Sequence, residues 1–319
     1  TRRSSDLQEL RAGNRSIFSR ALQAQLTQVL ENGEQAILFL NRRGLATYVF
    51  CRDCGYTATC NNCDTPLTYH GEAKTLVCHR CGTRERPPET CPQCGSQRIR
   101  YFGLGTERIE AEVVEQFPTA RTLRWDFDTT RGPNAHAIIL RHFANHQADV
   151  LIGTQMVAKG LDLPLVTLVG VISADTGLVL PDYRAAERTF QLLAQVAGRA
   201  GRGLRGGQVI IQSFMPDHYA IEAASQHNYA QFYAEEMRYR RDQGFPPYTN
   251  LARLVYRNRN AQKAEVEARH VAAKLRNILD EQQANSTFVI GPAPCFFDRV
   301  AGEFRWHIVL RGPNPAAFL

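Results

Sequence analysis

The sequence lacks three features that would place it in common protein classes. Its 319 residues contain no run of 18 apolar residues, which excludes a typical membrane-spanning helix. The chain starts with Thr1 instead of methionine, and no apolar signal-peptide core follows. It contains no Gly-x-x-x-x-Gly-Lys-Ser/Thr phosphate-binding loop and no acidic magnesium-binding strand motif. We therefore expect a fragment of a cytoplasmic protein without a phosphate-binding loop of this kind.

The charge of the chain is moderately basic. Its formal net charge is +7 and its pI is about 9.0. This excess favours an anionic partner such as nucleic acid. A soluble domain with a mild surplus of basic residues fits the composition equally well, so the charge alone does not decide between them.

Cysteine is the residue type with the clearest pattern. Eight of the nine cysteines form four C-x-x-C pairs. The pairs are Cys51/Cys54, Cys60/Cys63, Cys78/Cys81 and Cys91/Cys94. Disulfides are disfavoured because no secretory signal accompanies them, and the spacing differs from that of iron–sulfur proteins. Eight thiolates in four pairs predict two zinc ions, each held by four cysteines.

The order of the pairs predicts how they share the two metals. Residues 64–77 are typical of a β-hairpin that turns near His70-Gly71, which brings Cys60/Cys63 beside Cys78/Cys81. The first and last pairs then form the second site, so the sites are nested. Glycines after three of the pairs fit turns with positive φ. With eight thiolates already available, we expect His79 to be a solvent-facing neighbour and not a ligand.

Charge also bears on the role of the cysteine-rich segment. Residues 51–100 contain seven Lys/Arg and five Asp/Glu. Eight thiolates with two Zn²⁺ outweigh this small positive excess, so the segment is a poor nonspecific clamp for phosphates. Two roles stay open: a shaped contact surface for a partner, or a structural staple for a segment too small to form its own core.

The chain on either side of the cysteines alternates between strand and helix patterns. Buried-strand patterns at 36–40, 150–152, 166–173 and 208–213 are separated by amphipathic helical patterns, which predicts a parallel α/β sheet. From about Pro216 the pattern changes to that of a small α+β domain. We therefore predict four segments: 1–50 and 101–215 as two parts of one α/β domain, 51–100 as a zinc-binding insert, and 216–319 as a C-terminal domain.

Two loops of the α/β domain are rich in functional residue types. Residues 153–164 follow a strand, and residues 195–203 end a helix. In the second loop Arg199 and Arg202 are three residues apart and flanked by glycines, as a phosphate clamp requires. Each loop alone is a weak signal. The two loops together, in this order and at the strand ends of a parallel sheet, are a strong signal.

These loops resemble motifs V and VI of superfamily 2 helicases: Thr-Gln-Met-Val-Ala-Lys-Gly-Leu-Asp-Leu-Pro from residue 154, and Gln-Val-Ala-Gly-Arg-Ala-Gly-Arg from residue 195. The resemblance is narrowed to the PriA family (primosomal protein N′) by the cysteine insert and by three further segments, 103–108, 124–129 and 182–188. The resemblance implies a RecA-like second helicase lobe that carries a two-zinc insert, followed by a small DNA-binding domain that is truncated in this chain.

The resemblance also implies a function for the intact protein. It would be an ATP-dependent 3′–5′ DNA helicase of replication restart, which binds branched DNA at stalled forks, promotes primosome assembly and loads the replicative helicase. Because the motifs of the first helicase lobe are missing from this chain, we expect the fragment alone not to hydrolyse ATP. Its cofactors would be two Zn²⁺ and ATP with Mg²⁺. Its partners would be forked and single-stranded DNA, single-stranded DNA-binding protein, primosome proteins and the replicative helicase. It would lie in the bacterial cytoplasm at the nucleoid, with no membrane partner.

The resemblance assigns roles to individual residues as well. Arg202 would be the arginine finger that reaches the γ-phosphate, and Arg199 would lie beside it as the second catalytic arginine. The other assignments are ATP binding for Gln195, Gly160 and Asp162, and DNA binding for Thr154 and Gln155.

Two other functions compete with the motor. One is an ATPase-silent, zinc-containing scaffold that binds DNA and recruits primosome proteins. The paired arginines favour the motor over this scaffold. The other is a zinc-ribbon transcription or repair factor, which leaves the two helicase-like loops unexplained.

Overall fold

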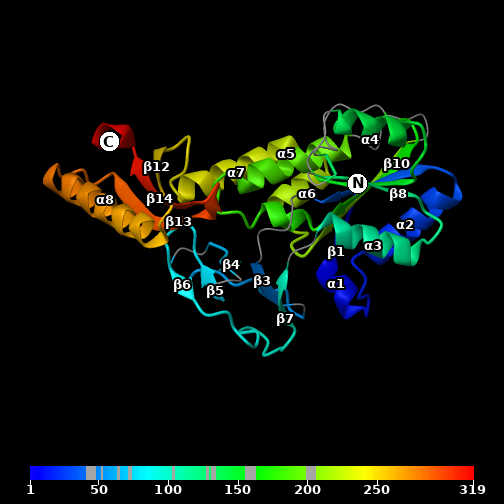
Figure 1. Cartoon of the computed structure of the whole chain (residues 1–319), viewed down its shortest axis with the longest axis horizontal. Coiled ribbons are helices and arrows are strands. Elements are labelled where there is room, and N and C mark those ends of the chain that lie inside the picture. The colour runs from blue at the N-terminus through cyan, green and yellow to red at the C-terminus, as the bar shows by residue number, and fades with distance from the viewer. Residues whose placement is uncertain are drawn as a thin grey trace. The chain divides into compact units, whose positions relative to one another are not determined.

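The structure is a computed structural model in which the described residues form two compact units (Figure 1). Unit 1 contains 1–56, 90–180 and 184–234, and unit 2 contains 57–89, 181–183 and 235–319. The residues described are 1–40, 48–51, 53–62, 65–70, 74–102, 105–126, 129–130, 134–154, 163–198 and 206–319. The four segments predicted from the sequence stay a prediction, since packing units and domains need not share boundaries.

Unit 1 is built on a six-stranded sheet in which every pair of neighbours is parallel. The strands in spatial order are β1 (Arg2–Ser5), β11 (Gln208–Ser213), β10 (Val166–Ile172), β2 (Gln35–Leu40), β9 (Val150–Gly153) and β8 (Thr122–Trp125). The predicted parallel α/β sheet is therefore confirmed. The sequence did not reveal β1, because this edge strand is polar throughout.

Helices cover both faces of this sheet. One face packs against α2 (Arg20–Glu31) and α3 (Thr106–Gln116), and the other against α4 (Ala135–Ala144), α5 (Ala185–Ala197) and α6 (Tyr219–Ser225) (Figure 1). All six residues of β2 are buried, as expected for a central strand covered on both sides. The short helices α1 (Asp6–Arg11) and η2 (Ala174–Gly177) follow β1 and β10. Their side chains therefore lie near the carboxyl edge of the sheet.

The cysteine-rich segment contributes short strands to both units. In unit 1, β3 (Tyr48–Cys51) pairs antiparallel with β7 (Ile99–Phe102). In unit 2, β4 (Thr68–His70), β5 (Thr75–Val77) and β6 (Arg84–Glu85) form an antiparallel ribbon. The β4–β5 pairing is the hairpin predicted between the two inner cysteine pairs.

The rest of unit 2 is a small α+β domain, as predicted. Its antiparallel sheet has the order β12 (Asn250–Asn258), β14 (Glu303–Gly312), β13 (Phe288–Val300). The long helix α8 (Ala261–Glu281) lies along one face of this sheet (Figure 1). Ala264, Ala268 and Ala272 are buried at helical spacing, and these small side chains let the helix lie close to the strands.

Two further helices complete the described chain. Helix α7 (Tyr229–Asp242) starts in unit 1 and ends in unit 2, and η3 (Pro315–Phe318) follows β14. In the described part of the chain, no helix combines the length and the apolar character that crossing a membrane requires.

Candidate functional site

The outer cysteine cluster consists of Cys51, Cys54, Cys91 and Cys94, and it lies within unit 1. Its four sulfur atoms all lie within 4.8 Å of one another. The Cys51–Cys94 and Cys54–Cys91 sulfur pairs are each 3.6 Å apart. Tetrahedral zinc with Zn–S bonds of about 2.3 Å separates its sulfurs by roughly 3.8 Å. The donor set and its spacing therefore fit a zinc ion.

The backbone around the outer cluster has the turns that its glycines suggested. Gly55 and Gly95 have φ values of +79° and +70°. Their N–H groups donate to the carbonyls of Cys51 and Cys91 at 3.0 and 2.8 Å. The N–H of Asp53 also points to the Cys51 sulfur, at 3.4 Å. The glycine bonds close the two turns, and the Asp53 N–H tempers the negative charge of the Cys51 thiolate.

Polar side chains hold the two loops of the outer cluster together. The carboxylate of Asp53 accepts hydrogen bonds from the Ser96 hydroxyl and from the Arg98 guanidinium. The Asp53 carbonyl accepts from Arg11 Nε at 3.4 Å, which links the loop to α1. The side chain of Arg98 is 59% exposed, so water screens this ion pair.

The inner cysteine cluster lies in unit 2 and includes Cys60, Cys78 and Cys81. Their sulfur atoms lie within 4.8 Å of one another, with Cys60 and Cys81 3.6 Å apart. The fourth predicted ligand, Cys63, lies outside the described residues. The three placed cysteines group as the nested order requires, and they fit zinc as the outer cluster does.

Hydrogen bonding favours the thiolate form at the inner cluster. Burial raises the pKa of the Cys81 thiol, but hydrogen bonds from the Thr83 hydroxyl and backbone N–H outweigh it and bring this pKa to about 6. The Thr83 hydroxyl lies 3.0 Å from the sulfur. Because zinc binds the thiolate, these bonds prepare the ligand for the metal.

The ribbon of unit 2 packs against the C-terminal sheet through His79. The His79 side chain is buried, with 2% of its surface exposed, and its Nδ1 atom donates to the Pro294 carbonyl at 2.8 Å. His307 Nε2 donates in turn to the His79 carbonyl at 2.8 Å. The Nε2 atoms of His70 and His79 are 3.1 Å apart. The expectation that His79 faces solvent is therefore wrong, and the residue belongs to the packing of the ribbon.

Gly82 marks how closely the ribbon approaches this sheet. Its φ is +83°, and a Cβ atom built on it would lie 2.7 Å from the Pro292 carbonyl oxygen. Real Cβ atoms essentially never come so close to another heavy atom. Only glycine fits here without a shift of the backbone.

One described residue of each helicase-like segment can be placed in unit 1. Thr154 directly follows β9 and is buried, and Gln195 is exposed in the last turn of α5. The other assigned residues lie outside the described residues: Gln155, Gly160, Asp162, Arg199 and Arg202. The structure therefore places the elements that lead into the two loops, and the roles of the loop residues stay predictions.

A buried carboxylate joins two of the quoted sequence segments at the carboxyl edge of the unit 1 sheet. Asp126, which follows β8, accepts from the Thr106 hydroxyl at 2.6 Å and from the Thr129 N–H at 3.0 Å. Arg124 Nε lies 3.4 Å from the same carboxylate. Thr106 is the first residue of α3, so Asp126 fixes the start of that helix against the end of β8.

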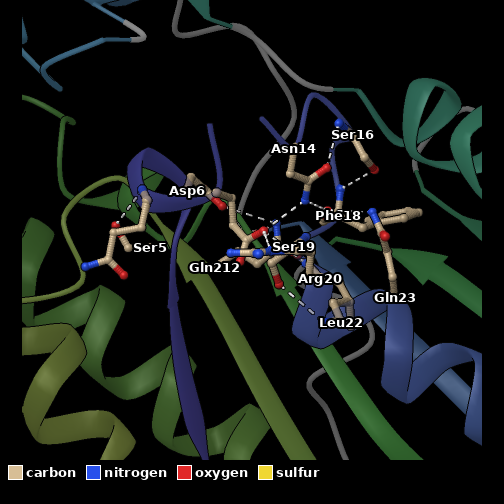
Figure 2. Close-up of polar contacts among 12 residues, drawn as sticks. Ser5, Asp6, Asn14, Ser16, Phe18, Ser19, Arg20, Leu22, Gln23 and Gln212 are labelled. Carbon is tan, nitrogen blue, oxygen red and sulfur yellow. Dashed lines mark hydrogen bonds and ion pairs between the residues drawn. The ribbon is translucent and has the colours of Figure 1, made fainter. Parts of the chain in front are cut away.

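A second polar network at this edge was missed by the sequence analysis (Figure 2). Gln212 at the end of β11 donates to Asp6 at 3.3 Å and to the Ile17 carbonyl at 2.8 Å, and it accepts from the Ser19 N–H at 2.9 Å. Burial and the nearby Asp175 carboxylate raise the pKa of Asp6 well above its usual value. No sequence motif marks these residues, because the sheet brings them together from distant parts of the chain.

Comparison with known proteins gives matches along most of the chain. The Primosomal protein N C-terminal domain model matches 241–318, the PriA DNA helicase Cys-rich region model matches 60–86, and the Helicase conserved C-terminal domain model matches 98–203. The structure of the C-terminal domain of the DEAD-box protein Dbp5 has a TM-score of 0.32 and 13% identity, over 65% of this chain and 78% of that one. So weak a structural similarity carries no argument.

Curated relatives extend the match beyond these domains. Replication restart protein PriA of Bacillus subtilis is 47% identical over 304 residues, and that of Synechocystis is 44% identical over 310 residues. These alignments cover 95% and 96% of this chain, but the chain spans only 37% of the length of each relative. The cysteine-rich region, the helicase C-terminal fold and the C-terminal domain thus occur together, and the chain belongs to the PriA family of replication restart proteins.

Proposed function

We propose that the intact protein is an ATP-dependent 3′–5′ DNA helicase of replication restart. It would bind branched DNA at stalled forks, promote primosome assembly and help to load the replicative helicase. The observation that carries this proposal is the order of the three matched regions, with the cysteine-rich region directly before the helicase domain and the PriA C-terminal domain after it. The parallel sheet with polar groups at its carboxyl edge supports it, because ligands of such sheets bind at that edge.

In this proposal the loop after β9 and the loop after α5 bind the nucleotide and the DNA. Arg202 reaches the γ-phosphate as the arginine finger, and Arg199 assists it. ATP with Mg²⁺ is bound with the help of Gln195, Gly160 and Asp162, and the DNA backbone is contacted by Thr154 and Gln155. The position of Thr154 at a strand end and the exposure of Gln195 on the last turn of α5 support these roles.

Two zinc ions would be bound, each by four cysteines. The outer ion would be held by Cys51, Cys54, Cys91 and Cys94, and the inner ion by Cys60, Cys63, Cys78 and Cys81. The sulfur spacings of the seven described ligands support this assignment. Each ion supplies a fixed tetrahedral crosslink in a segment that has little apolar core of its own.

The partners follow from the same proposal. The intact protein would bind forked and single-stranded DNA, single-stranded DNA-binding protein, primosome proteins and the replicative helicase. The cysteine-rich segment is a candidate contact surface for the protein partners, because its charge suits phosphate binding poorly. The protein would act at the nucleoid in the bacterial cytoplasm, without a membrane partner.

The arginine finger provides the decisive test. In the intact protein, Arg202→Ala should lower DNA-stimulated ATP hydrolysis by about 10³-fold or more while nucleotide binding persists, since such arginines act on the transition state. Hydrolysis is measured by phosphate release, and binding by a fluorescent ATP analogue. The matched control is Arg205→Ala, which removes the same charge three residues later.

Each result of this test selects one of the functions. Unchanged turnover in Arg202→Ala would contradict the finger assignment. An intact protein that binds DNA and primosome proteins but hydrolyses no ATP would instead be the ATPase-silent scaffold.

A further inference from the structure

Two histidines of unit 2 face each other through the same ring atom. His70 ends β4, and His79 lies in the turn between Cys78 and Cys81. Their Nε2 atoms are 3.1 Å apart, which suits either a shared hydrogen bond or a shared metal ion. We call these two residues the histidine pair. Neither belongs to a cysteine cluster, so the two zinc sites do not explain why the rings meet.

The other ring nitrogen of each histidine faces an acceptor on β13. His79 Nδ1 lies 2.8 Å from the Pro294 carbonyl oxygen, and His70 Nδ1 lies 3.5 Å from the Asp298 carboxylate. A carbonyl oxygen can only accept, so Nδ1 of His79 carries a proton. Burial disfavours a second proton on this ring, because it would bring a charge into the interior. The Nε2 atom of His79 therefore presents a lone pair to His70.

No arrangement of protons on two neutral rings satisfies all of these contacts. If His70 carries its proton on Nδ1, facing Asp298, two lone pairs meet between the Nε2 atoms. If the proton lies on Nε2 instead, a lone pair of His70 faces the carboxylate. One positive ion at the Nε2 atoms removes the conflict. That ion is either a second proton on His70 or a metal ion bound by both rings.

We propose that the histidine pair binds a divalent transition metal ion such as Zn²⁺, in addition to the ions of the two cysteine clusters. Zinc–nitrogen bonds of about 2.0–2.1 Å to two atoms 3.1 Å apart enclose an angle of roughly 100° at the metal. This angle is close to that of a tetrahedral site. Imidazole nitrogen is a ligand that suits zinc, copper and nickel alike. The proposal does not depend on the helicase function put forward above.

The surroundings of the pair are those of metal-bound histidines. Such residues almost always donate their other ring N–H to a carboxylate or a backbone carbonyl, which fixes the ring and makes it a stronger ligand. Asp298 and Pro294 provide one acceptor of each kind. The ring of Phe296 also contacts the His79 ring edge-on, with the centroids 5.5 Å apart. The two rings are therefore oriented before a metal ion arrives.

Water would complete the coordination of this ion. Among the described residues, no further His, Cys, Asp or Glu side chain joins the pair to make a group of three ligand atoms. The His70 side chain is 21% exposed, whereas His79 is buried, so solvent reaches the site from the side of His70. With two protein ligands, the site should bind zinc more weakly than a cluster of four cysteines does. Because its ligands lie on the ribbon and their acceptors on β13, a bound ion would tighten the contact between these elements.

The test is zinc binding by the zinc-loaded chain after dialysis, which leaves only tightly held ions. Isothermal titration calorimetry with Zn²⁺ should show one further ion bound by the unaltered chain. His70→Ala should lose this binding but keep the ions that survive dialysis, counted by native mass spectrometry. The control is His270→Ala, which removes an exposed histidine of α8 and should change the affinity less than twofold. A failure of the cysteine clusters would appear separately, as fewer than two ions after dialysis.

A second variant keeps both ligands and removes only the acceptor of His70 Nδ1. The Asp298 side chain is 51% exposed, so Asp298→Ala should shift the melting temperature without added zinc by no more than about 1–2 °C. The affinity for the further zinc ion should nevertheless fall about tenfold, as expected when the partner of a ligating histidine is lost. This variant decides the matter even if His70→Ala fails to fold. Unchanged affinity in Asp298→Ala would contradict the site.

Two other results would also overturn the proposal. If the unaltered chain binds no zinc beyond the ions that survive dialysis, a proton on His70 supplies the missing positive charge. If His70→Ala binds a further ion as tightly as the unaltered chain, that ion lies elsewhere on the surface. One further ion that requires His70, is weakened by Asp298→Ala and is unaffected by the control is the result that supports the site.

Discussion

The outer and inner cysteine clusters share their ligand chemistry but differ in their surroundings. The outer cluster is held by exposed polar contacts of its own loops, such as the Asp53–Arg98 ion pair. The inner cluster belongs to a ribbon whose buried His79 and close-fitting Gly82 contact the C-terminal sheet. The same C-x-x-C pattern thus serves a local crosslink in one unit and a packed contact in the other. Removal of the inner zinc should therefore disturb the C-terminal sheet as well, whereas removal of the outer zinc should disturb only its own loops.

The largest expected effect comes from removing one ligand of each cluster. Cys78→Ser and Cys91→Ser should each lose one zinc per chain, because a structural zinc site uses four protein ligands. Each loss should be strongly destabilising, since structural zinc contributes on the order of 10 kcal/mol to a small domain. Only Cys78→Ser should also expose the backbone amides of β13, since the ribbon then no longer packs against Pro294. Zinc is counted by mass spectrometry, and exposure by hydrogen exchange.

The two variants serve as controls for each other. Equal loss of protection in β13 from Cys91→Ser would show that the clusters do not differ in the way proposed. Unchanged protection in Cys78→Ser would show that the ribbon packs on the sheet without its metal.

Two glycines test the same contrast with a smaller effect. Gly82 and Gly95 both have positive φ, but only Gly82 has a backbone oxygen where a Cβ would lie. Gly95→Ala should cost about 1 kcal/mol, the cost of a left-handed conformation. Gly82→Ala should cost about 2 kcal/mol or more, because Pro292 must also move. Chemical denaturation of the zinc-loaded chains measures both, and equal costs would contradict the close approach of the ribbon to the sheet.

Local sequence patterns predicted the parts of this molecule that depend on short stretches of chain. The alternation of buried strands and amphipathic helices was enough to predict the parallel sheet, and the spacing of the cysteines was enough to predict how the seven described ones group. The polar strand β1 was missed because only its pairing with β11 makes it a strand.

Contacts between distant parts of the chain were not predictable in this way. His79 was expected in solvent because eight thiolates already fill the two zinc sites. Its actual partner, the Pro294 carbonyl, lies 215 residues away and gave no local signal. Likewise, the sequence marked Gly82 as a turn residue but gave no sign of the oxygen opposite it. Such contacts depend on how the ribbon folds against the sheet, which no local pattern records.

The last effect is absent at neutral pH and appears only in acid, and it concerns two histidines, one in each unit. Burial lowers the pKa of both His218 and His307 to about 4. Above about pH 6.5 the folded and unfolded forms of each are neutral, so the depressed pKa costs nothing. As the pH falls from about 6.5 to 4, the unfolded chain takes up a proton that the folded chain does not. Stability should then fall by up to about 1.4 kcal/mol per pH unit for each histidine.

His218 allows this loss to be assigned to unit 1 alone. Its Nδ1 atom accepts from the Ala220 N–H at the start of α6, and asparagine makes the same cap without titrating. His218→Asn should leave stability at about pH 7.5 unchanged and reduce the loss at about pH 5, as measured by chemical denaturation. Comparing variant with parent at each pH cancels the release of zinc that both undergo. An equally steep acid loss in the variant would mean that His218 is accessible to protons in the folded chain, and that the acid sensitivity resides in unit 2, where His307 is buried.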